Sequence, residues 1–272
     1  MRRHTLRGAA VFITLASLGA AAQGGGERCA EAVRSRPGQI TVAASVLLGP
    51  PMICHEILIG KARSLPWDGG RGGSRSSYSI EKLPSEAAAL LAAEPSAIVR
   101  METLRRAAVY LSHDESDRAG ALAWEFIGRR AGAVLSGEAS GKIDPQAWFD
   151  VAYFIGCLNQ VGLGKIVTLG EADGIPGYRF MLKAIEEAEK SQLNAGMLAQ
   201  MHFGAAVMSH PAMRHKNYQY AIGTVNDVYD RHILAALKSS KDDTLLETNL
   251  SAHLKNFGSS IDDVRKVAAA GK

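Results

Sequence analysis

The sequence lacks the short motifs that mark the common enzyme classes. It contains no Gly-x-Ser-x-Gly nucleophile turn, no phosphate-binding loop and no glycine pattern for a dinucleotide. A zinc-protease motif would need a second histidine four residues after His55, and that position is Ile59. Cys54 precedes His55, but adjacent residues on a helix point apart, which disfavours a nucleophile and its base. The sequence therefore assigns no catalytic residue and no cofactor.

The chain also has little excess charge once its first residues are set aside. The 272 residues include 31 Lys and Arg against 27 Asp and Glu, and three of the arginines lie within the first seven positions. Without those three the balance is 28 against 27, which removes the basic surplus typical of nucleic-acid binding. We therefore exclude nucleic acid as the main partner.

Residues 1–22 have the three-part organisation of a secretory signal peptide. A basic start precedes an uncharged apolar run over 9–18, and small residues at 20–22 match a cleavage site. The apolar run is too short to span a bilayer, so no membrane span is expected after cleavage. We expect a mature chain that begins near Gln23 and is exported to the periplasm or secreted.

There are only three cysteines, Cys29, Cys54 and Cys157. In an oxidising compartment two of them can pair, and the sequence allows three pairings. Cys29 with Cys54 is favoured, because both lie in the irregular N-terminal region. That bond would close a loop of about 25 residues and stabilise the fold by roughly 3 kcal/mol. Cys157 lies in a strongly apolar helix and is expected to be a small buried side chain; the alternative is that all three thiols are reduced and buried.

Downstream of the leader the chain divides into three parts. Residues 23–63 form an irregular N-terminal segment, in which Pro51 begins a helix predicted over 52–62. Residues 64–83 are rich in Gly and Ser and predict a flexible loop. Over 84–272, apolar side chains recur at every third or fourth position, without a hairpin signal or period-two alternation. The prediction is an all-α domain, built as an array or bundle of antiparallel helix pairs.

Two of the predicted helices have clear starts. Asp144 and Pro145 supply an N-cap and a first-turn proline for a helix over 146–161, which is apolar on nearly every side and should be central. Residues 260–263 have the form of a capping box for a last short helix. The helix over 146–161 also resembles the first helix of a tetratricopeptide (TPR) unit at Ala147-Trp148, Val151-Ala152 and Ile155. This partial resemblance implies stacked helix pairs, with a TPR-like α-solenoid as one form of the array.

Histidines are the candidates for a metal site. His202, His210 and His215 lie near one another in the sequence. Two histidines eight residues apart lie on one side of a helix, so a metal could bridge them if His215 folds back. No carboxylate accompanies them at helical spacing, and metal sites need three or four ligands. A helix end followed by a polar loop is the competing interpretation, and we assign no metal.

A second set of residues could form a binding surface. His232 and His253 each lie on an apolar stripe, where a histidine must find a hydrogen-bond partner. They are either structural or line one ligand pocket. Because aromatic side chains dominate binding patches, Trp148, Tyr153 and Tyr178 are candidates for a groove, with the protein core as their competing location.

These observations favour an interaction or scaffold protein over an enzyme. Helical arrays commonly offer an extended surface to a partner, which here would be a protein or peptide of the cell envelope. Because fold does not fix function, the alternative is an envelope hydrolase or a metal-dependent enzyme that uses the histidines.

Overall fold

The computed structural model describes residues 50–68, 77–114, 118–165, 169–210, 228–256 and 259–270. Within these ranges the chain forms helices that pack against one another, with no β-strand and one isolated bridge between Ala172 and Ile175. The all-α prediction is confirmed. The predicted leader, Cys29 and His215 lie outside the described residues.

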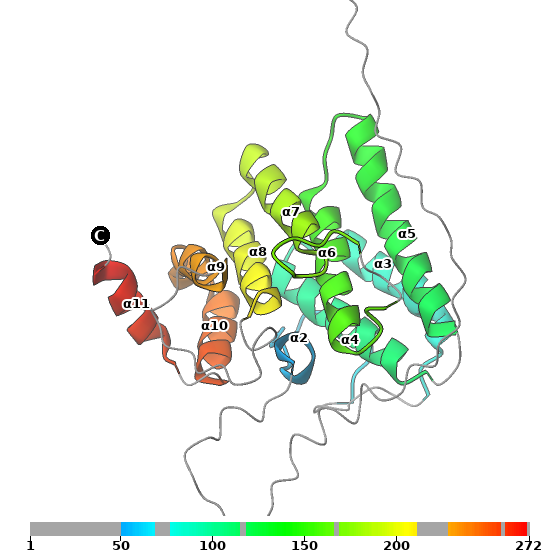
Figure 1. The fold of residues 1–272 in the computed structure, drawn as a ribbon, viewed down its shortest axis with the longest axis horizontal. Helices are drawn as coiled ribbons and strands as arrows, with labels where there is room; N and C mark the ends of the chain where they lie inside the picture. Colours follow the sequence, from blue (N-terminus) through cyan, green and yellow to red (C-terminus); the bar gives the residue numbers. More distant parts are fainter. Residues whose placement is uncertain are drawn as a thin grey trace, which may run out of the picture.

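The helices follow one another along the chain as α2 (Pro51–Cys54), the 3-10 turn η1 (Ile80–Lys82), α3 (Leu83–Ala93), α4 (Ala97–Ser112), α5 (Arg118–Ala139), α6 (Pro145–Gln160), α7 (Tyr178–Lys190), α8 (Ala195–Met208), α9 (Val228–Leu237), the 3-10 turn η3 (Ser240–Asp242), α10 (Thr244–Asn256) and α11 (Ile261–Ala270). Successive helices from α5 to α9 contact their neighbours in a row, and α10 and α11 continue it towards the C-terminus (Figure 1). This arrangement is an array of packed helices; its TPR-like character remains a prediction.

Helix α6 lies at the centre of the array, as its sequence predicts. It contacts α4, α5, α7 and α8. The Asp144 carboxylate accepts hydrogen bonds from the backbone N–H groups of Gln146 and Ala147, so the predicted N-cap is confirmed. Most side chains of α6 are buried, including Phe154 and Cys157 at 0% exposure. These buried apolar side chains are why the neighbouring helices gather around α6.

Helix α7 begins two residues after Pro176. Gly177 occupies the N-cap position with a φ of +78°, a left-handed conformation that favours glycine. A Cβ on Gly177 would stand only 2.5 Å from the carbonyl oxygen of Ala152 on α6. The glycine therefore permits both the turn into α7 and the close contact between α7 and α6.

The predicted helix over 52–62 is wrong beyond its first turn. Helix α2 ends at Cys54, and the backbone is extended at His55. Gly60 has a φ of +59°, which an α-helix does not contain. The helix does not continue through residues 55–64, where the N–H groups of Ile57 and Leu58 and the carbonyl of Leu58 bond to side chains of α4 and α10, as described below. The predicted loop over 64–83 is also shorter than expected, because η1 begins at Ile80 and Leu65 is buried.

A buried ion-pair cluster joins three helices of the array. Oδ2 of Asp150 on α6 lies 2.7 Å from Nη1 of Arg100 on α4 and 2.7 Å from Nη2 of Arg130 on α5. Asp150 is fully buried, and Arg100 also donates to the carbonyl oxygens of Leu91 and Glu94, at and just after the end of α3. We call Asp150, Arg100 and Arg130 the arginine clamp. It fixes the relative positions of α3, α4, α5 and α6.

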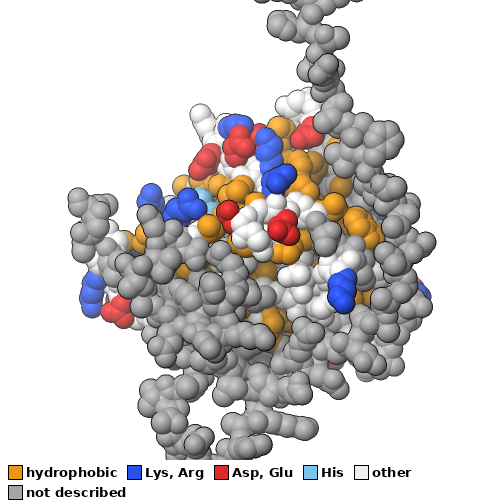
Figure 2. Space-filling view, in the orientation of Figure 1, with side chains coloured by type: hydrophobic (Ala, Val, Ile, Leu, Met, Phe, Trp, Pro, Cys, Tyr) orange, Lys and Arg blue, Asp and Glu red, His pale blue; other side chains and the backbone are white. Residues whose placement is uncertain are grey.

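The remaining charged residues of the described chain are mostly solvated. On α7, Lys183, Glu186 and Lys190 form ion pairs, and Figure 2 shows basic and acidic side chains together over this helix. The predicted N-cap of α11 is confirmed, since Ser260 Oγ accepts from the backbone N–H of Asp263; the Asp263 carboxylate accepts from Ser260 Oγ, where a complete capping box would have it accept from the Ser260 backbone N–H. Among the residues that the structure describes, no helix has the length and apolarity needed to cross a bilayer.

Candidate functional site

The aromatic residues expected to form a groove divide between core and surface. Tyr153 and Tyr178 are 0% and 2% exposed, so both lie in the core, the competing location, and not on a groove. Tyr153 is buried because α6 is enclosed by its neighbours, and Tyr178 bonds to the buried His232 on α9. Trp148 is half-buried and packs against Phe180, with 5.3 Å between ring centroids. Trp148 alone of the three keeps a partly accessible face.

The histidines do not assemble as the sequence spacing predicts. His202 and His210 belong to two separate clusters, the first with His232 and the second with His253. Across the described residues, no group of three or more His, Cys, Asp or Glu side chains is placed to hold a metal ion. The three-histidine site proposed for His202, His210 and His215 therefore receives no support from the two members that are described.

The first cluster is a chain of hydrogen bonds through three helices. His232 on α9 lies between Tyr178 on α7, whose hydroxyl is 2.7 Å from His232 Nε2, and His202 on α8, whose Nδ1 is 2.9 Å from His232 Nδ1. Tyr178 and His232 are buried, whereas His202 is partly exposed. Each neutral imidazole has one donor and one acceptor nitrogen, so the tautomers of the two histidines are coupled. We call this the Tyr178–His232–His202 chain.

Burial keeps both imidazoles of this chain neutral near pH 7. It lowers the pKa of His232 to about 3, with smaller contributions from the charges of His202 and Arg231. It lowers the pKa of His202 to about 4, with a smaller contribution from Lys238. Each ring therefore has one donor and one acceptor nitrogen, and both nitrogens of His232 are engaged in the chain.

The second cluster is an aromatic one at the ends of α8 and α10. The ring of His210 stands edge-on to Tyr229 and to His253, with centroid distances of 4.8 and 5.5 Å, and Phe203 packs against His253 at 5.7 Å. Burial lowers the pKa of His210 to about 3 and that of His253 well below its usual value. His232 and His253 thus lie in different clusters, so the idea that they line one pocket is wrong.

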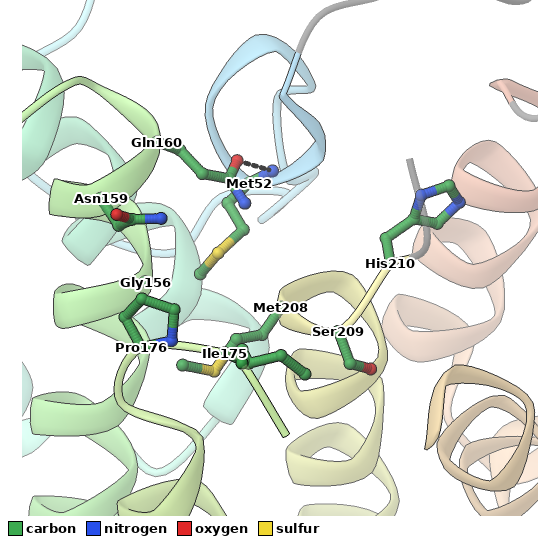
Figure 3. A pocket seen from close by; sticks show the side chains of 10 residues that line it. Met52, Gly156, Asn159, Gln160, Ile175, Pro176, Met208, Ser209 and His210 are labelled. Atoms are coloured by element: carbon green, nitrogen blue, oxygen red, sulfur yellow. Dashed lines mark hydrogen bonds between the residues drawn. The ribbon is translucent and has the colours of Figure 1, made fainter. Parts of the chain in front are cut away.

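A cavity of about 70 Å³ lies where α6 and α8 end (Figure 3). Met52 and Met208 reach towards Gly156 from different elements, while the ring of His210 points away from both. A Cβ on Gly156 would stand 2.9 Å from Met52 Cε and 3.2 Å from Met208 Cε, so glycine makes room for the two thioethers. At roughly 10–15 Å³ for each water, the cavity holds a few solvent molecules rather than a substrate.

Several polar side chains of the array bind residues 50–68, which begin with the one-turn helix α2 and then continue without regular structure; we call these residues the N-terminal segment. Asn249 on α10 contacts both backbone groups of Leu58: its Oδ1 accepts from the N–H at 2.8 Å, and its Nδ2 donates to the carbonyl at 2.8 Å. The side chain of Leu58 is 44% exposed. Asn249 therefore recognises the main chain of this residue and not its side chain.

Charged side chains of helix α4 also bind the main chain of the N-terminal segment. Glu102 Oε2 accepts from the N–H of Ile57 at 3.1 Å, Arg105 Nη1 donates to the carbonyl of Ile53 at 3.0 Å, and Arg106 Nη1 donates to that of Leu65 at 2.7 Å. Glu102 is fully buried and forms ion pairs with both arginines at 2.7 Å, which holds the guanidinium groups in place.

Three further contacts complete the binding of the segment. Gln160 Oε1 on α6 accepts from the N–H of Met52 at 2.9 Å, and the Tyr110 hydroxyl donates to the carbonyl of Pro66 at 2.7 Å. The guanidinium of Arg105 lies 4.8 Å from the ring centroid of Trp67. We use the name cradle for the residues that bind the segment: Glu102, Arg105, Arg106, Tyr110, Gln160 and Asn249.

The charged residues of one apolar helix are a sequence signal for part of the cradle. Glu102, Arg105 and Arg106 all lie on α4, where most side chains are buried. Charged residues are almost never fully buried unless they are paired, so their density on this helix indicates buried ion pairs and hydrogen bonds. Asn249 and Gln160 gave no such signal.

Comparison with protein-family models, with curated proteins and with solved structures gives no match for this chain. Its function must therefore be argued from the cradle, the clusters and the cavity themselves.

Proposed function

We propose that this is an exported helical scaffold that binds an extended polypeptide segment through side chains that contact the main chain. The support comes from how the array holds its own N-terminal segment. The cradle residues satisfy backbone groups at residues 52, 53, 57, 58, 65 and 66. Main-chain hydrogen bonds supply affinity in extended-peptide recognition, while pockets for side chains supply specificity.

The two-sided contact of Asn249 with Leu58 is the observation that carries this proposal. A side-chain amide that accepts from the N–H and donates to the carbonyl of one residue fixes the direction and position of that backbone, and it does so for any side chain at that residue. A permanent piece of protein core could be held in the same way. The two roles differ in whether the segment can be exchanged while the helices remain folded.

Exchange of the N-terminal segment tests the proposed function. The test inserts a protease site in the Gly/Ser-rich stretch 69–76, cleaves it under native conditions and adds a labelled peptide of residues 50–68. We expect the label to enter the array while the circular dichroism of the helices is unchanged. Asn249→Ala removes two hydrogen bonds of roughly 1 kcal/mol each, so it should speed release of the peptide by on the order of 10- to 30-fold.

A matched control lies on the same helix. Asn256 on α10 bonds at 3.0 Å to the side chain of His55 and has no such pair of bonds to the main chain. Because His55 belongs to the N-terminal segment, Asn256→Ala removes one hydrogen bond of roughly 1 kcal/mol and should speed release by about 5-fold, less than Asn249→Ala. If the nicked protein takes up no label until the helices unfold, the N-terminal segment is a fixed part of the core and the proposed function fails.

Export and the Cys29–Cys54 bond form the second part of the proposal. Expressed with its own leader, the protein should be recovered outside the cytoplasm with an N-terminus near Gln23. Cys157 is a free, buried thiol whose pKa is raised by burial, so it should react with a maleimide only after denaturation. Mass spectrometry should then count one reactive thiol without reductant and three with it. Three reactive thiols without reductant would contradict the bond.

A further inference from the structure

We propose that His202 and His232 chelate a divalent transition-metal ion through their two Nδ1 atoms, with Cu²⁺ bound most tightly. The site is formed where α8 and α9 meet. It is independent of the cradle and of the proposed function.

The distance between the two nitrogens carries the proposal. His202 Nδ1 and His232 Nδ1 are 2.9 Å apart. Two nitrogens that each lie about 2.0 Å from one metal ion are about 2.8 Å apart when the angle at the metal is 90°, and about 3.3 Å apart when it is tetrahedral. The observed separation is that of the hydrogen bond between the two rings, and it is also close to the value for the right angle that Cu²⁺ prefers in tetragonal sites, so a metal ion could replace the shared proton with little movement of the rings. Cu²⁺ also heads the general affinity order of the divalent metals for nitrogen ligands.

Tyr178 supplies the outer support that metal-bound histidines usually have. Its hydroxyl lies 2.7 Å from Nε2 of His232, the nitrogen remote from the metal position. When both Nδ1 atoms bind the metal, each ring carries its proton on Nε2. The proton shared between the two Nδ1 atoms moves to Nε2 of the ring that carried it, so both rings hold their proton on Nε2, His232 Nε2 donates to the Tyr178 oxygen, and no proton is released. This hydrogen bond fixes the tautomer and orientation of His232.

The surroundings of His202 and His232 determine how a metal ion reaches the pair and how tightly it binds. His202 is partly exposed, and a metal ion would reach the pair from its side, with water as the remaining ligands. Both imidazoles are neutral near pH 7 and do not have to lose a proton to bind. The positive charges of Lys238 and Arg231 act on the two histidines and weaken the binding of a cation. With two protein ligands and these charges, we expect a dissociation constant on the order of micromolar.

Electron paramagnetic resonance of the full chain titrated with Cu²⁺ at pH 7.5 tests this site. We expect one equivalent of Cu²⁺ with hyperfine coupling to two nitrogens, and we expect His202→Phe and His232→Phe each to abolish that signal. Tyr178→Phe should weaken binding about 10- to 100-fold without abolishing it. His113→Gln, which changes an exposed histidine at the end of α4, should leave the signal unchanged.

Two results would overturn the site. One is adventitious binding only, in which His202→Phe and His232→Phe keep the stoichiometry and spectrum of the unaltered chain. The other is the absence of a two-nitrogen Cu²⁺ signal in the unaltered chain at millimolar Cu²⁺. If His232→Phe fails to fold, His202→Phe decides the question, because His202 is the partly exposed member of the pair.

Discussion

Replacing Asp150 by asparagine is expected to destabilise the protein by about 3–5 kcal/mol. The substitution keeps the size of the side chain and removes the one carboxylate that contacts both arginines of the clamp. Arg100 and Arg130, which are 2% and 7% exposed, would then be buried without that counter-charge. The loss should appear in urea unfolding as a lower midpoint with an unchanged dependence on denaturant.

An exposed pair on α5 provides the control for the arginine clamp. Glu125 and Arg129 form an ion pair at 2.8 Å in which both side chains are about half exposed. Solvent screens such a pair, so Glu125→Gln should cost less than about 1 kcal/mol. A loss of similar size for Asp150→Asn would show that the arginine clamp contributes little to stability.

Lowering the pH from 7.5 to 5 is expected to remove about 4 kcal/mol of stability through His210 and His253 together. The folded-state pKa of His210 is about 3, and that of His253 lies well below its usual value of 6.5, because both are buried among aromatic rings. Below pH 6.5 the unfolded chain binds protons that the folded chain does not. Stability is therefore complete above the unfolded-state pKa and falls by about 1.4 kcal/mol per pH unit for each histidine as the pH drops.

Chemical unfolding at a series of pH values, with a chelator present, measures this effect. His253→Phe replaces an acid-sensitive group with another aromatic ring beside Phe203 and Tyr229. Between pH 6 and 5 it should reduce the slope of the unfolding free energy against pH by about 1.4 kcal/mol per pH unit, which corresponds to about one proton. The charges of His210 and His55 act on His253. Because the pKa of His210 is itself lowered, His210→Phe should reduce the pH dependence of stability by a similar amount. If the unfolding free energies of His253→Phe and of the unaltered chain changed with pH in parallel, the lowered pKa of His253 would be refuted.

The helices were predictable where local chemistry and packing agree. Asp144 and Pro145 fix the start of α6 whatever surrounds it, and the apolar content of α6 requires burial. The helix over 52–62 failed for the opposite reason. Its apolar spacing was compatible with a helix, but Glu102 and Asn249 bind its backbone groups and override the local preference.

The candidate site was less predictable than the fold. His232 was identified as a histidine that needs a partner, yet its partners lie 30 and 54 residues away, on α8 and α7. Spacing along one helix paired His202 with His210 instead. Helix crossings bring together residues that no sequence period relates, so clusters of this kind follow only from the packed structure.

The bond between Leu58 and Asn249 joins residues 191 positions apart. A chain that leaves a translocation channel N-terminus first would present its N-terminal segment long before α10 arrives to hold it. Contacts of such high sequence separation form late, because a long loop must close first. Throughout that interval Leu58 and its neighbours would be open to proteases and to chaperones. If the protein is exported as proposed, final folding would depend on complete passage of the polypeptide, and a truncated product that lacks α10 would leave residues 50–68 without the Asn249 contacts and open to degradation.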